Sequence, residues 1–266
     1  MSKVKTLAEH LEYVEAVARL SFSYAWSVSS RLPDMELSDI IRRHTMLYYH
    51  ILNLDADMPR QELQAVKAED IAEFEELMWH ACKDFIIEKA SAFYPDSIGM
   101  PGYIQKPRYK WNCGSLKYDE PHAKLPGYCV FHIANGTAPR SIFDVPGHLL
   151  ECFEKLLHDS EKEYGYQVLY TKTWLNDKEE FLYYFPEEWR QNRSSIDRNS
   201  LPSWNIGDWG QLITARGLLN PKTAAFLRQN GYLPYASRKA HCSFASMREH
   251  LKSIRARQAD SWPPRP

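Results

Sequence analysis

The hydrophobic pattern changes its period along the chain, and this change limits the fold more than any other feature. Apolar residues recur every three to four positions in the first and last thirds, which is the spacing of one helix face. Two runs in the middle, Tyr128–Ala134 and Tyr166–Thr173, are instead rich in β-branched and aromatic residues. The pattern predicts a mainly helical α+β protein with a small β-sheet of about two strands in the middle of the chain.

Prolines, glycines and apolar stripes bound the expected helices. The first helix should end before Pro33, because a residue that precedes proline avoids the helical conformation. Pro146 begins the helix between the two strands, and Gly165 follows its end. Strand, helix and strand in this order favour a parallel pair, although a β-ribbon in another register also fits. The expected helices cover about 7–32, 34–51, 66–92, 146–164, 178–189, 208–216, 220–230 and 243–255.

The segment 94–127 interrupts the regular pattern. It contains five prolines together with several tyrosines and Trp111. Loops of this length are uncommon in compact proteins and often cover functional sites, whereas a disordered linker would hold few aromatic residues. We therefore expect a single domain over 1–266, in which 94–127 is a long covering loop packed against the body.

Composition limits the environment and the partners. The apolar fraction of 44% is that of a soluble globular protein, and 33 basic against 34 acidic residues leave no net field for nucleic acid or a membrane surface. The cations of 248–257 suit the end of a helix dipole. Five dispersed cysteines without a Cys-x-x-Cys pair indicate reduced thiols, and no apolar run is long enough to cross a bilayer. We expect a soluble, cytoplasmic protein whose partner is a small molecule, with no nucleic-acid or membrane partner. The sequence does not determine the oligomeric state.

Two histidines are the candidate catalytic residues. His132 lies on the first predicted strand between apolar neighbours on both faces, so it should be buried or line a cavity. An imidazole titrates near neutral pH and therefore suits general acid or base catalysis. His44 lies within the apolar stripe of the second helix and should also face inward. A core histidine that binds a backbone carbonyl is the alternative interpretation of both.

The candidate substrate-binding residues stand at strand ends and helix starts. Amides and guanidinium groups there are suited to binding a carboxylate or phosphate. If the strands pair in parallel, the amides that follow them could lie side by side. The predicted set is Asn135, Arg140, Asn176, Trp209, Gln211 and Arg216. Plain turns, a surface arginine and core tryptophans are the alternative.

Metal and cofactor motifs are weak. His148 and His158 project away from the apolar stripe of their helix, so the His148–Glu151 spacing carries little weight. Acidic residues that open the third helix, between 69 and 76, are explained by the helix dipole. Neither a Gly-x-Gly-x-x-Gly nor a Gly-Lys-Ser/Thr motif is present. We expect no cofactor and predict no metal ligands, and the sequence leaves a bound metal ion open.

These observations together favour an enzyme that acts on a small polar or anionic metabolite. The chemistry would be histidine acid–base catalysis without an organic cofactor, of lyase, isomerase or hydrolase type, in an aromatic-rich pocket. Two alternatives stay open. One is a non-catalytic ligand-binding or protein-interaction module that uses the same pocket, and the other is an enzyme with a histidine-bound metal.

Overall fold

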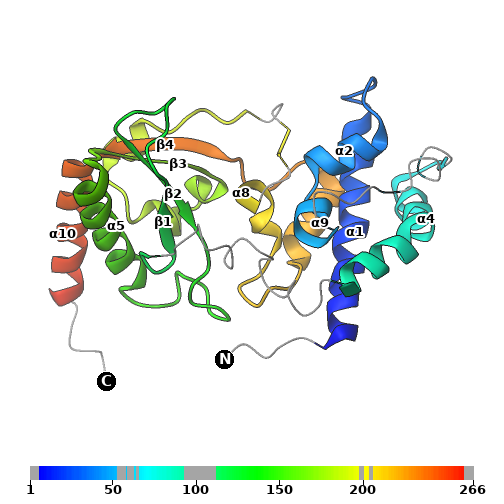
Figure 1. Cartoon of the computed structure of the whole chain (residues 1–266), viewed down its shortest axis with the longest axis horizontal. Helices are drawn as coiled ribbons and strands as arrows, with labels where there is room; N and C mark the ends of the chain where they lie inside the picture. Colours follow the sequence, from blue (N-terminus) through cyan, green and yellow to red (C-terminus); the bar gives the residue numbers. More distant parts are fainter. Residues whose placement is uncertain are drawn as a thin grey trace. The chain divides into compact units, whose positions relative to one another are not determined.

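The computed structural model describes residues 6–52, 58, 63, 66–92, 112–197, 201–203 and 206–260 (Figure 1). The chain divides into two compact units, each built from two stretches of sequence. The helical unit comprises 1–106 and 197–234, and the sheet unit comprises 107–196 and 235–266. Each unit has its own hydrophobic core.

The helical unit is organised around its first helix. Its elements are α1 (Leu7–Ser29), α2 (Leu37–His44), a π-helix (Tyr48–Leu52), α4 (Ile71–Ala92), α8 (Ile206–Trp209), a 3-10 turn (Gly210–Leu212) and α9 (Pro221–Asn230). Thr6 begins α1 with a capping box, in which its hydroxyl accepts from the Glu9 amide and the Glu9 carboxylate accepts from the Thr6 amide. The inner face of α1 contacts α4, α2 and α9. Residues such as Val14, Val17 and Phe22 are fully buried there.

The sheet unit contains a four-stranded mixed sheet in the order β1-β2-β3-β4. Its elements are β1 (Leu116–Tyr118), β2 (Tyr128–Ile133), α5 (His148–Tyr164), β3 (Val168–Thr173), a 3-10 turn (Trp174–Asp177), α6 (Glu179–Leu182), α7 (Glu187–Gln191), β4 (Arg238–Ser243) and α10 (Phe244–Asp260). β2 and β3 are parallel, as a strand–helix–strand unit favours, while β1 and β4 pair antiparallel at the two edges.

The two faces of this sheet differ in burial. One face presents Cys129, Phe131 and Leu169 to a core shared with α5, α10 and the aromatic residues of 181–189, and these three side chains are fully buried. The opposite face, which we call the open face, keeps all but one of its side chains half-buried or exposed. The register places on it Lys117, Tyr128, Val130, His132, Val168, Tyr170, Lys172, Lys239, His241 and Ser243. Of these, Lys117 alone is buried.

The predicted fold class is confirmed in its coarse form, because the chain is mainly helical and α+β. The sheet, however, has four strands where about two were expected. β1 has only three residues and lies among prolines, and β4 is rich in charged and polar residues, so neither resembles an apolar strand. Three expected helices are also interrupted. A π-helix replaces the end of 34–51, while 178–189 and 208–216 each break into short helical turns.

The segment 94–127 lies only partly within the described residues. Positions 94–111 are outside them, so the covering role stays a prediction. The remainder is more regular than expected, because β1 pairs with β2 and an isolated bridge joins Cys113 to Leu116. The expected single domain also stays a prediction. The two units have separate cores and divide within this segment, and thermal unfolding decides whether they form one cooperative domain.

Candidate functional site

His132 lies on the open face beside a carboxylate and a buried ammonium group. It donates from Nε2 to Oδ2 of Asp119 at 2.7 Å. Lys117 is directly opposite His132 in the β1–β2 register, and its Nζ is 3.8 Å from the other carboxylate oxygen of Asp119. The His132 side chain is 35% exposed, so it is only half-buried, and its role in a cavity stays a prediction.

Backbone and side-chain bonds fix Asp119 just beyond the end of β1. Its amide donates to the Val130 carbonyl at 2.9 Å, and the Tyr166 hydroxyl donates to the Asp119 carbonyl at 3.0 Å. Burial by itself would raise the pKa of Asp119, but the hydrogen bond and positive charge of His132, with Lys117, outweigh burial and hold this pKa below its ordinary value. The carboxylate is therefore kept ionised as a partner for the imidazole.

Lys117 contributes a second unusual group to this cluster. Its side chain is 3% exposed, and desolvation lowers the pKa of its ammonium group although Asp119 acts in the opposite direction. The positive potential of a buried cation beside the dyad can stabilise negative charge on a bound molecule. His132, Asp119 and Lys117 thus combine a proton-transfer group, a group that orients it and a charged group.

The other predicted residues of the sheet unit have local structural roles. Asn135 is half-buried and organises its own loop, where Nδ2 donates to the Arg140 carbonyl at 3.0 Å and Oδ1 accepts from the Thr137 amide and hydroxyl. The Arg140 side chain is exposed. Asn176 is fully buried, accepts from Trp189 Nε1 at 3.0 Å and donates to the Arg238 carbonyl at 2.7 Å. The amides of Asn135 and Asn176 are therefore both occupied by separate protein partners.

The predicted residues of the helical unit have structural partners as well. His44 is half-buried and its Nδ1 donates to the Pro202 carbonyl at 3.0 Å, as the core-histidine alternative predicts. Trp209 is fully buried against Tyr24, with ring centroids 5.0 Å apart, and its Nε1 donates to the Ser203 carbonyl at 2.9 Å. Gln211 is buried and donates to the Asp208 carbonyl at 2.8 Å. Arg216 lies in a turn and is exposed.

His148 occupies a different position from the one expected. Instead of facing solvent, it lies half-buried at the start of α5, with Nε2 2.7 Å from the Ser115 hydroxyl and 3.6 Å from the Cys152 sulfur. The same hydroxyl accepts from the Gly136 amide at 3.0 Å. Ser115 is fully buried, and burial raises the pKa of the Cys152 thiol. This cluster joins three segments of the core and does not present an accessible nucleophile.

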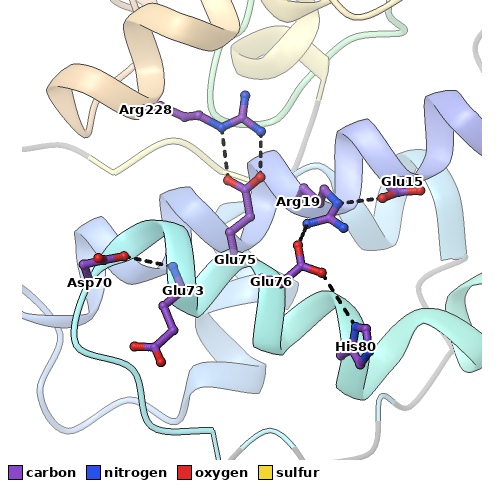
Figure 2. A network of polar contacts seen from close by, with 8 residues as sticks. All are labelled: Glu15, Arg19, Asp70, Glu73, Glu75, Glu76, His80 and Arg228. Carbon is purple, nitrogen blue, oxygen red and sulfur yellow. Dashed lines mark hydrogen bonds and ion pairs between the residues drawn. The ribbon is translucent and has the colours of Figure 1, made fainter.

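The acidic residues of α4 pair with cations of neighbouring helices, as Figure 2 shows. The Glu75 carboxylate accepts hydrogen bonds from both Nε and Nη2 of Arg228 on α9, each at 3.0 Å. The Glu76 carboxylate accepts a hydrogen bond from Arg19 on α1 at 2.7 Å. Asp70 instead caps the helix by accepting from the Glu73 amide. Across the described parts of the chain, no three His, Cys, Asp or Glu side chains form a group that could hold a metal ion. The carboxylates of Glu75 and Glu76 therefore connect α4 to α9 and to α1.

Comparisons with known proteins give no relative for this chain: no protein-family model, no curated protein and no solved structure matches it. Within the described residues, no helix is long and apolar enough to cross a lipid bilayer. The sequence analysis predicted a role for His132 but did not single out Asp119 or Lys117, although Leu116–Asp119 alternates apolar and charged residues.

Proposed function

We propose that the sheet unit acts on a small polar or anionic metabolite by acid–base chemistry at His132. The observation that carries the proposal is the 2.7 Å contact between His132 Nε2 and Asp119 Oδ2 on a face that solvent reaches. A carboxylate bonded to one ring nitrogen fixes the orientation of an imidazole and stabilises its protonated form. The other nitrogen, Nδ1, then exchanges a proton with the bound molecule.

The charges around His132 support an anionic substrate. Asp119 balances the protonated imidazole, while Lys117 adds a second cation within 3.8 Å of that carboxylate. A substrate carboxylate or phosphate would face the protonated imidazole, and the buried Lys117 ammonium group would add its field in a partly desolvated setting, where charge interactions are stronger than in water. Proton removal beside such a group would suit a lyase or isomerase, and proton delivery to a leaving group would suit a hydrolase.

The proposal is tested by incubating the protein with a defined mixture of carboxylated and phosphorylated metabolites and following the mixture by mass spectrometry. His132→Gln is the diagnostic variant, because a glutamine amide can still donate to Asp119 but cannot transfer protons at neutral pH. His158→Gln is the matched control, since His158 is an exposed histidine on α5 of the same unit. Conversion by wild type and His158→Gln, but not by His132→Gln, is expected.

The alternatives predict different outcomes of the same experiment. Equal conversion by His132→Gln and wild type would refute the role of His132. A metabolite that raises the melting temperature without being converted would favour a binding module. Stoichiometric metal in the purified protein, with activity lost on chelation, would favour a metal enzyme whose ligands include residues outside the described set.

A further inference from the structure

Aromatic rings lie next to one another across three adjacent strands of the open face. Tyr128 on β2 makes edge contacts with Tyr170 on β3, with ring centroids 6.2 Å apart, and with His241 on β4 at 6.1 Å. All three side chains are half-buried. Their ring surfaces are therefore partly accessible to a flat ligand, and stacking on such rings is a common way to hold a nucleobase.

Two lysines lie beside these rings and face each other. Lys172 on β3 is directly opposite Lys239 on β4, and both side chains are exposed. Like charges in directly opposite positions destabilise a sheet. Arg238, next to Lys239, is paired with Asp177 at 3.3 Å, whereas no carboxylate of the described chain pairs with either lysine. An anion bound between the two ammonium groups would relieve their repulsion.

The spacing of these groups matches one class of ligand. Tyr170 and Lys172 point to the same face two residues apart, which places them about 6.6 Å apart along the strand. This is comparable with the span from a nucleobase to its 5′-phosphate. We propose that the open face binds a nucleoside monophosphate, with the base stacked on Tyr170 and bordered by Tyr128, whose ring is at 82° to that of Tyr170, and with the phosphate between Lys172 and Lys239. The proposal does not rest on the acid–base chemistry of His132.

The charge distribution favours a mononucleotide over a nucleic-acid strand. The formal net charge is −1, and strand binding requires a run of cations that follows successive phosphates. On α10, Arg248 pairs with Glu161 and Arg255 pairs with Glu154, so these cations are already neutralised by α5. One pair of opposed lysines is instead matched to a single phosphate group.

The chain of 266 residues is titrated calorimetrically with adenosine 5′-monophosphate and, separately, with adenosine and with ribose 5-phosphate, which are the two halves of that ligand. We expect the monophosphate to bind more tightly than either half. Lys172→Gln and Lys239→Gln should each weaken it about tenfold, the size of one charge-assisted hydrogen bond. Tyr170→Leu should weaken it by a similar factor, whereas Lys162→Gln, an exposed lysine on α5, should not.

Thermal stability separates this role from a structural one. Removing one of two opposed charges should leave the melting temperature of Lys172→Gln and Lys239→Gln unchanged or raised while affinity falls. Absence of binding at millimolar adenosine, guanosine, cytidine and uridine monophosphates overturns the proposal, as does undiminished affinity in both lysine variants. An oligonucleotide that binds while none of the monophosphates does would identify a nucleic-acid surface instead.

Discussion

Replacing Asn176 with alanine tests whether this residue is a structural hub or a ligand contact. The side chain is fully buried, and it joins the Trp189 indole to the backbone of Arg238 through bonds of 3.0 and 2.7 Å. Each bond contributes about 1 kcal/mol, and an indole N–H left buried without an acceptor costs a further ~1–3 kcal/mol. Asn176→Ala should therefore destabilise the sheet unit by roughly 3–5 kcal/mol.

The assay is urea denaturation followed by far-ultraviolet circular dichroism. A double-mutant cycle with Trp189→Phe should give a coupling energy of roughly 2–4 kcal/mol, because the phenylalanine removes both the bond and the donor that would be left without an acceptor while it retains most of the packing. Asn192→Ala is the control: Asn192 is exposed, and its 3.4 Å contact with the His241 carbonyl should be worth no more than about 0.5 kcal/mol. A cost for Asn176→Ala no larger than that of Asn192→Ala would refute the structural role.

Three further predictions concern charge and cooperativity. The pKa of Asp119 lies below its ordinary value of 3.8, so the ionised carboxylate stabilises the folded state. Asp119→Asn should therefore lower the free energy of unfolding by at most about 1 kcal/mol at pH 7, and this difference from wild type should vanish as the pH falls below 3.8. Urea titrations at several pH values measure it, and a difference that grows at low pH would contradict it. Arg228→Gln should lower the free energy of unfolding by about 0.5–1 kcal/mol, because it removes the bidentate bond to Glu75. This loss should be smaller at high salt than at low salt, and an equal loss at the two salt concentrations would exclude an electrostatic origin. A single calorimetric transition is expected if 1–266 is one domain, whereas two resolved transitions would establish two independently folding units.

Sequence periodicity predicted the elements with strong apolar patterns. The parallel pair of β2 and β3 follows from the order strand, helix and strand, and Pro221 and Gly231 marked the ends of α9 correctly. The pattern failed where tertiary contacts outweigh local preference. β4 forms because its backbone pairs with all six residues of β3, although Arg238, Lys239 and His241 have no apolar periodicity.

The candidate site was less predictable than the fold. The β1–β2 register alone places Lys117 opposite His132, and a three-residue strand carries no register information in its sequence. His148 was misjudged because its position on the helix wheel excludes contact with the main stripe but does not reveal the loop that supplies Ser115. The hydrogen bonds of Asn176 and Trp209 likewise depend on backbone groups that no residue pattern identifies.

The catalytic role of His132 is tested most directly by the turnover of His132→Gln on a metabolite that the wild type converts. Loss of a general acid or base typically lowers turnover by a factor of about 10²–10⁴. We predict a loss in this range at an unchanged melting temperature, with His158→Gln retaining wild-type turnover. Turnover of His132→Gln within a few-fold of wild type would contradict the account and leave the contact between His132 and Asp119 as an ion pair that joins β2 to the end of β1.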